Sequence, residues 1–183
     1  MSKVAVFFAT GHEEIEALTV VDLLRRAGIE TNMISITGEL EVTGSHNIRT
    51  KMDKLFEEEN YDEYDIVVLP GGMPGTKNLE ACESLMNLLK DRVAQNKMIA
   101  AICAAPTVFG HAGFLKGKKA CCYPDMEDGL FGAEVSYNEV EVDGNVITSR
   151  GMGTAIPFGL KLVALLQGQA SADALGAKIV YRQ

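Results

Sequence analysis

Unbroken apolar runs alternate with amphipathic stretches along this chain. Val4–Ala9 and Ile66–Leu69 are apolar at every position, as expected for strands that are buried on both faces of a sheet. Ile29–Ile36 and Met98–Ile102 are predicted as two further strands. Because helix-like segments separate these strands, the pattern predicts βαβ units and a parallel sheet.

Capping signals and a 3.6-residue periodicity place the helices. Thr10 and Glu13 have the T-x-x-E spacing of a capping box, and the helix that they open is predicted to end near Ala27, with Gly28 as its stop. Three further helices are predicted. The first runs from about Leu79 to Ala94, and the second is a short one with Pro106 in its first turn. The third runs from about Thr154 to Gln167, and it places Ile156, Leu160 and Val163 on one stripe.

Two antiparallel excursions interrupt this alternation. Thr37-Gly38 and Thr43-Gly44 punctuate a short one. Asp143-Gly144 is a strong two-residue hairpin signal between the strand-like segments Glu139–Val142 and Asn145–Ser149. No repeat, low-complexity tract or linker divides the chain, so its 183 residues are predicted to form one α/β domain, 1–183.

Composition and charge exclude several classes of protein. The 47% hydrophobic and 23% charged residues fit a soluble globular protein rather than a disordered or fibrous one. The chain has 17 Lys and Arg against 25 Asp and Glu, a formal net charge of −8, which argues against nucleic acid or an anionic membrane as a partner. No apolar run approaches the roughly 20 residues of a membrane span. Gly11-His12-Glu13-Glu14 stands where a signal peptide would be cleaved.

The four cysteines have no pairing or metal-binding pattern. Cys82, Cys103, Cys121 and Cys122 form neither a CxxC motif nor a Cys/His zinc pattern. With no secretory signal, we expect them to be reduced in a cytoplasmic protein without a structural metal.

Cys103 stands where a buried strand meets a helix. It follows Met98–Ile102, and the small residues Ala104 and Ala105 allow a sharp strand-to-helix turn. Such a turn presents a nucleophile at the carboxyl end of the sheet, and the backbone N–H groups that follow lower the pKa of a thiol. The alternative is a buried core cysteine, since Cys also packs as a small hydrophobe.

Glu16 is an acidic residue on the apolar face of the first helix. It shares a stripe with Val20, Leu23 and Ala27, whereas Glu13 and Glu14 are expected to face solvent. A buried carboxyl group tends to be protonated and can donate a hydrogen bond to a thiolate. The alternative is a cap or a surface salt bridge near the start of the helix.

Two glycine-containing segments are candidates for binding. Gly71 and Gly72 follow a buried strand, where the Gly72 N–H, together with that of Ala104, can stabilise an oxyanion; an ordinary strand-to-helix turn is the alternative. Arg150 lies in the glycine-containing loop from Ser149 to Thr154, which lacks a P-loop lysine and a dinucleotide fingerprint. Arg150 is expected to pair with the Glu16 helix, bind an anionic substrate, support an interface, or be solvated.

These segments together resemble the ThiJ/PfpI superfamily, and most closely the branch of the Parkinson-disease-associated protein deglycase and its bacterial relatives. The order and spacing of the matching pieces cover nearly the whole chain. The matching pieces are Glu13-Glu14-Ile15-Glu16, Asp65–Gly72, Ala100–Pro106 and Thr148–Thr154.

The resemblance implies a flavodoxin-like three-layer sandwich, with a mostly parallel sheet between helices, and a homodimer. It implies that Cys103 is the nucleophile, Glu16 the protonated glutamate, and Gly72 and Ala104 the oxyanion donors. The implied activities are cofactor-independent removal of dicarbonyl adducts and glyoxalase-type conversion of methylglyoxal. An oxidation sensor and a chaperone are the other roles implied.

Two departures from the family pattern refine this interpretation. Members named proteases carry His directly after the cysteine, where this chain has Ala104, so peptidase activity is not expected. Some members place a His where this chain has Tyr123. A phenol with a pKa of about 10 is a poor general base, so Tyr123 is expected to donate a hydrogen bond or to line the pocket.

The sequence thus predicts a hydrolase or lyase of deglycase or glyoxalase type that acts on dicarbonyls or their thiol and amine adducts through a Cys103 thiolate. The alternative is an oxidative-stress sensor or redox-regulated chaperone that uses oxidation of Cys103. No metal, nucleotide or other cofactor is expected to take part.

Overall fold

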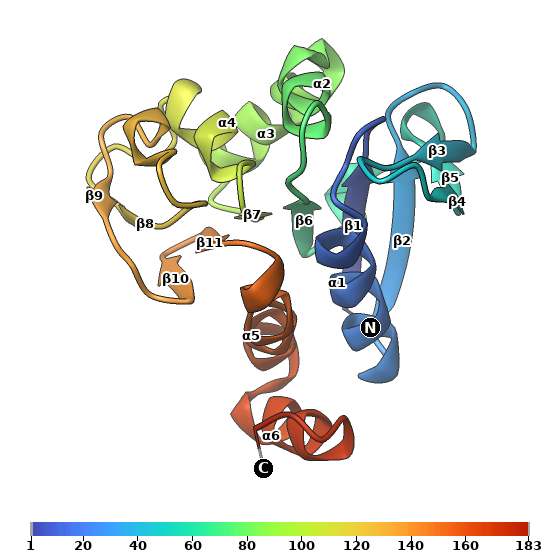
Figure 1. The fold of residues 1–183 in the computed structure, drawn as a ribbon, viewed down its shortest axis with the longest axis vertical. Helices are drawn as coiled ribbons and strands as arrows, with labels where there is room; N and C mark the ends of the chain where they lie inside the picture. Colours follow the sequence, from blue (N-terminus) through green and yellow to red (C-terminus); the bar gives the residue numbers. More distant parts are fainter. Residues whose placement is uncertain (1, 183) are drawn as a thin grey trace.

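A seven-stranded sheet forms the centre of the computed structural model, which describes residues 2–182 (Figure 1). The strand order is β10-β11-β7-β6-β1-β2-β5, and all strands run parallel except β10, which pairs antiparallel with β11. The sheet strands are β1 (Lys3–Phe8), β2 (Glu30–Ser35), β5 (Lys54–Leu55), β6 (Ile66–Leu69), β7 (Met98–Ile102), β10 (Val140–Asp143) and β11 (Val146–Ser149).

Helices cover both faces of this sheet and create two apolar cores. Alternate residues of β1 supply one core each: Val4 and Val6 pack with α1, α5 and α6, whereas Ala5 and Phe7 pack with α2, α3 and α4. The helices are α1 (Glu14–Arg26), α2 (Gly75–Ala81), α3 (Glu83–Ala94), α4 (Pro106–His111), α5 (Ala155–Gln167) and α6 (Gln169–Lys178). This arrangement confirms the predicted three-layer, mostly parallel fold.

Smaller elements decorate the sheet. Two short pairs lie outside it: β3 (Glu41–Thr43) with β4 (Arg49–Lys51), and β8 (Lys119–Ala120) with β9 (Glu134–Val135). The antiparallel β3–β4 pair is the excursion predicted after Thr37-Gly38. The 3-10 turns are η1 (Phe56–Glu58), η2 (Tyr61–Glu63), η3 (Glu127–Gly129) and η4 (Met152–Thr154).

Several predicted boundaries were wrong in detail. Glu13 caps α1 instead of Thr10, because its carboxylate accepts the Glu16 N–H at 2.7 Å. The helix predicted from Leu79 to Ala94 is two helices that meet at Cys82, and α6 was not predicted at all.

The stripe predicted for α5 was right at Val163, which is fully buried, but wrong at its other two positions. Ile156 is 36% exposed and Leu160 is only partly buried. The face that packs against α1 carries Gly159, where a Cβ atom would come within 2.6 Å of Leu23. The close approach of α1 at this glycine therefore selects the buried stripe Ala155, Phe158, Leu162 and Val163.

The connection between β10 and β11 is a hairpin, as predicted, with its turn shifted by one residue. Asp143 pairs with Val146, so the two turn residues are Gly144 and Asn145. Gly144 has φ +60°, which glycine adopts without steric cost.

The candidate site lies where the winding of the sheet changes direction. From β1 the chain proceeds outward through β2 on one side and through β6, β7 and β11 on the other. The loops after β1 and β6 therefore lead into helices on opposite faces and leave a crevice at the strand ends. No helix among the described residues is long and apolar enough to cross a membrane.

Candidate active site

Cys103 is the first residue after β7, and its backbone is fixed in an uncommon conformation. Its φ is +66°, a region that costs a residue with a Cβ atom about 1–2 kcal/mol. Three hydrogen bonds hold the turn: Cys103 N–H to the Ser149 carbonyl at 3.0 Å, Ala105 N–H to Ile102 at 3.1 Å, and Tyr123 N–H to the Cys103 carbonyl at 2.8 Å. The predicted sharp turn between strand and helix is present, and the side chain is half-buried.

Two backbone N–H groups donate to the Cys103 sulfur. They belong to Ala104, the next residue, and to Gly72, which follows β6. The pair predicted from the sequence as oxyanion donors thus converges on the thiol. Gly72 has φ +89°, and a Cβ atom there would lie 2.3 Å from the Glu13 nitrogen, so only glycine fits this position.

Gly71 lets the strand end pass close to the two reactive groups. A Cβ atom on residue 71 would lie 2.6 Å from the Cys103 Cβ and 2.7 Å from Glu16 Oε2. The Gly71 N–H donates to Glu16 Oε2 at 3.0 Å. Gly71 therefore acts through its backbone N–H, which positions the Glu16 carboxyl group.

Glu16 is 1% exposed and hydrogen-bonds the Cys103 thiol. It shares a buried face with Val20 and Leu23, as its spacing predicted. Burial raises the pKa of Glu16 to about 7, although hydrogen bonds from Cys103 and Gly71 act in the opposite direction. This carboxyl group can therefore take up and release a proton near neutral pH.

The electrostatics of Cys103 differ from the prediction. Burial and the adjacent Glu16 raise the pKa of the thiol, whereas the N–H groups of Ala104 and Gly72 lower it. The turn thus acts in the expected direction but is outweighed, first by burial of the thiol and then by Glu16. When Glu16 holds the proton, the Cys103 thiolate has no carboxylate charge beside it, so the two negative charges do not repel each other. This state has the same net charge as a thiol beside an ionised Glu16, so the two groups share one proton.

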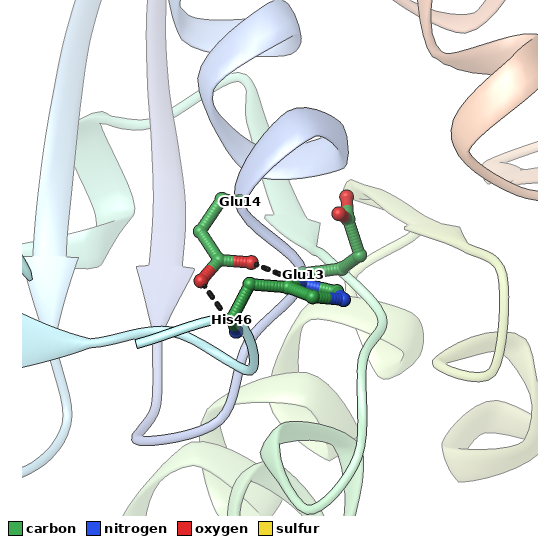
Figure 2. Close-up of side chains that lie close together, drawn as sticks. All are labelled: Glu13, Glu14 and His46. Atoms are coloured by element: carbon green, nitrogen blue, oxygen red, sulfur yellow. Dashed lines mark hydrogen bonds and ion pairs between the residues drawn. The ribbon is translucent and has the colours of Figure 1, made fainter. Parts of the chain in front are cut away.

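Glu14 is buried, at 3% exposure, and this overturns the expectation that it faces solvent. Its carboxylate accepts from the His46 N–H at 2.7 Å and from His46 Nδ1 at 3.0 Å (Figure 2). It also accepts from the Ser45 hydroxyl at 3.2 Å. Burial raises the pKa of Glu14, but the hydrogen bonds from His46 and Ser45 outweigh it and hold the pKa at about 2.

Glu13, Glu14 and His46 bring potential metal-ligand atoms within 4.8 Å of one another (Figure 2). Both carboxylates already accept hydrogen bonds, Glu13 as the cap of α1 and Glu14 from the loop after β3. The cluster therefore has a structural explanation that needs no ion, and it lies one turn of α1 before the Cys103 contact.

None of the three histidines within residues 2–182 contacts the thiol. His12 is fully buried with Nδ1 2.9 Å from the Ala9 carbonyl, and burial lowers its pKa. His46 binds Glu14, and His111 lies 2.7 Å from Glu80. Glu16 is thus the titratable side chain in place to move a proton at Cys103.

Tyr123 and Arg150 lie beside the pair rather than within it. Tyr123 is 50% exposed, and a Cβ atom on Gly151 would lie 3.4 Å from its ring. Arg150 does not pair with α1; its guanidinium lies over Tyr137, 5.6 Å from the ring centroid. Tyr137 was not predicted from the sequence, where its only signal is an aromatic residue in a polar segment before the hairpin.

The other cysteines lie in different surroundings. Burial raises the pKa of Cys121 and that of Cys122, the latter to about 12, and Cys82 sits between α2 and α3. All four cysteines are free.

Comparisons with known proteins identify relatives of this chain. The profile of the DJ-1/PfpI family matches residues 2–165. DJ-1 homolog A of Arabidopsis thaliana is 40% identical over 95% of this chain, and a Pyrococcus abyssi protein named as a deglycase is 31% identical over 90% of this chain and 99% of its own length. The chain spans less than half, 42% and 45%, of the length of two curated Arabidopsis relatives.

A solved structure shares the whole fold. The structure described as oxidized Toxoplasma gondii DJ-1 superposes with a TM-score of 0.95 at 37% identity and covers all of both chains.

Proposed function

The chain belongs to the DJ-1/PfpI family, and from that premise we propose that it is a cysteine-dependent, cofactor-independent enzyme of deglycase or glyoxalase type. Its substrates are reactive dicarbonyls or their early adducts on thiols and amines. The observation that carries the proposal is the convergence on the Cys103 sulfur of two backbone donors and a buried Glu16 with a pKa of about 7.

The first step is addition to an aldehyde. The Cys103 thiolate attacks the aldehyde carbon of methylglyoxal, a C–S bond forms, and the electron pair of the C=O bond moves to oxygen. The N–H groups of Gly72 and Ala104 stabilise this oxyanion. Glu16 then supplies its proton, which leaves a hemithioacetal and a glutamate carboxylate.

The second step moves one proton between two carbons of the substrate. The Glu16 carboxylate removes the proton from the former aldehyde carbon and returns it to the neighbouring carbon, while the hydroxyl proton of the hemithioacetal passes to the oxygen on that neighbouring carbon; the product is a lactoyl thioester on Cys103. Water then hydrolyses this thioester, releases lactate and restores the thiol. Methylglyoxal plus water gives lactate, so no metal, nucleotide or external oxidant is needed. Glyoxal gives glycolate by the same route.

Replacement of the nucleophile tests the proposal. Cys103→Ser should consume methylglyoxal at the rate of the buffer alone, whereas the matched control Cys82→Ser, at a free cysteine between α2 and α3, should retain wild-type consumption. If Cys103→Ser consumes methylglyoxal as fast as wild type, the proposed cysteine-dependent activity is wrong.

A second candidate function is an oxidation sensor. The donors that hold an oxyanion are also suited to a cysteine sulfinate, and a relative of known structure is described as oxidized. Sub-stoichiometric peroxide should then produce one defined sulfinate, on Cys103, detectable by mass spectrometry. Oxidation spread over all four cysteines would contradict a sensor. A chaperone in which Cys103 is incidental predicts instead that suppression of client aggregation survives Cys103→Ala, whereas a chaperone regulated by oxidation of Cys103 predicts that this variant loses its response to peroxide.

We further propose that the protein is a cytoplasmic homodimer. A groove of about 650 Å³ runs along α1, and its apolar residues Ile15 and Ile48 are 51% and 52% exposed. Exposed apolar residues grouped in this way are typical of a protein interface, and a second copy of the chain is the occupant that the family resemblance implies.

A further inference from the structure

Arg150 differs from every other arginine of the described chain. The side chains of Arg25, Arg26, Arg49, Arg92 and Arg182 each donate to an oxygen atom of the protein. Within residues 2–182, the Arg150 guanidinium has neither an ion pair nor a hydrogen bond, and its Nε atom is buried without an acceptor. A buried donor without a partner costs about 1–3 kcal/mol. An anionic ligand would offset this cost.

The groove that Arg150 lines has a volume of about 460 Å³. Three large side chains that line the same groove are exposed: Tyr123 is 50% exposed, Tyr137 69% and Met152 52%. The contact with Tyr137 holds the guanidinium over an aromatic face. A single cation among exposed aromatic side chains is typical of a binding surface.

Two residues that line this groove, Tyr123 and Gly151, lie next to Cys103 and Glu16. Tyr123 donates its backbone N–H to the Cys103 carbonyl at 2.8 Å. Gly151, next to Arg150, lies where a Cβ atom would be 3.4 Å from the Tyr123 ring and 4.0 Å from Glu16 Oε1. A substrate whose carbonyl carbon is bonded to Cys103 can therefore extend past Tyr123 and Gly151 toward Arg150.

The charge of the groove selects among anions. Glu139 also lines it, and its carboxylate is engaged by Arg182. A nearby carboxylate disfavours a dianionic phosphate more strongly than a singly charged ligand. A planar carboxylate, in addition, matches the geometry of a guanidinium.

We propose that Arg150 and Tyr137 form a carboxylate-binding subsite, so that the preferred substrates of Cys103 are dicarbonyl adducts whose amine or thiol carrier bears a free carboxylate. The reaction that follows binding is that of the proposed function, on which this inference rests. Free amino acids and the carboxyl termini of short peptides share this chemistry. Adducts on internal side chains of a folded protein lack it.

Matched alkylating probes test the subsite without any turnover. Iodoacetyl-glycine and iodoacetyl-glycinamide react alike: Cys103 Sγ displaces iodide, a C–S bond forms, and the thiol proton goes to the buffer. They differ only in the terminal carboxylate. The ratio of their rate constants at Cys103, located by mass spectrometry, should be about tenfold higher in wild type than in Arg150→Gln, as expected when a charged hydrogen bond is lost.

Three comparisons sharpen this measurement. The loss should appear in the half-saturating concentration of the carboxylate probe rather than in its limiting rate. Arg150→Lys, which keeps the charge, should restore part of the ratio. Lys90→Gln removes one exposed positive charge from α3 and should leave the ratio at its wild-type value. Iodoacetyl-glycylglycine places the carboxylate one residue further from the reacting carbon. A faster reaction of iodoacetyl-glycine would indicate amino-acid carriers, and a faster reaction of iodoacetyl-glycylglycine would indicate the carboxyl termini of peptides.

An unchanged ratio in Arg150→Gln, or an equal fall in Lys90→Gln, would overturn the subsite. Binding is also measured independently of the thiol: the chain has 5 Tyr and no Trp, so N-acetylglycine should change tyrosine emission saturably in wild type but not in Arg150→Gln. Absence of that change in wild type would overturn the subsite as well. Methylglyoxal consumption is assayed separately, so failure of the proposed function leaves the probe ratio as its own result.

Discussion

Gly71 lies so close to Cys103 that a Cβ atom on residue 71 would come within 2.6 Å of the Cys103 Cβ. The same atom would lie 2.7 Å from Glu16 Oε2. The backbone that follows β6 thus lies close to both Cys103 and Glu16, and the spacing of this pair depends on the absence of a side chain at residue 71.

Gly71→Ala should therefore damage the site more than the fold. We expect methylglyoxal consumption to fall at least about tenfold, because displacements of about 1 Å cost this much or more in catalysis. The control is Gly176→Ala on α6, where the nearest atom to a Cβ is 3.6 Å away; it should retain activity. Full activity in Gly71→Ala would contradict this dependence.

Glu16→Gln should separate thiol reactivity from turnover. The amide preserves size and hydrogen bonding but cannot exchange a proton near neutral pH, so turnover should fall about 100-fold or more. Cys103 should still react with iodoacetamide, since Gly72 and Ala104 continue to donate to its sulfur. Glu83→Gln, at the start of α3, is the matched control. Loss of alkylation together with turnover would show that Glu16 acts on the structure of the site.

Glu14 should make the protein sensitive to acid. Its pKa is held at about 2 in the fold against an ordinary value of 4.5, so the unfolded chain binds its proton first as the pH falls. The stabilisation is fully present above about pH 4.5 and is lost progressively down to about pH 2. Urea unfolding across this range should show a loss of about 1–2 kcal/mol in wild type. If the free energy of unfolding of Glu14→Gln depends on pH as steeply as that of wild type between about pH 4.5 and pH 2, this assignment is contradicted.

Ile15→Glu should weaken the proposed dimer. Ile15 is 51% exposed on the groove along α1, and two like charges placed across a two-fold contact repel each other and lose apolar burial. Light scattering after size exclusion should give the mass of a dimer for wild type and of a monomer for the variant. Phe131→Glu changes an apolar residue that is 57% exposed elsewhere, and it should stay dimeric. A wild-type monomer would exclude the dimer directly.

The sequence was sufficient for the framework of the site. Unbroken apolar runs located β1 and β6, the small residues around Cys103 located the turn, and the stripe of Glu16 with Val20 located the buried acid. Each of these signals is local, so the chain reveals them without knowledge of its partners in space.

The features that were missed depend on contacts between distant segments. Glu14 is buried because His46, in the loop after β3, covers it, and no periodicity in α1 encodes that loop. The α5 stripe depends on Leu23 of α1. The raised pKa of Cys103 likewise requires the burial and the Glu16 charge that only the fold supplies. The single-domain organisation over residues 1–183 stays a prediction.

The hydrogen bonds at Cys103 have a consequence for how this position can vary. Ser149 and Tyr123 hold the residue by its N–H and its carbonyl group, and neither of these hydrogen bonds involves the Cys103 side chain. The identity of the side chain is therefore uncoupled from the geometry that presents it. Residue 103 can therefore be Cys, Ser or Ala while the loops around it keep the same backbone path. The chemistry of the site can be gained or lost by one substitution at this position.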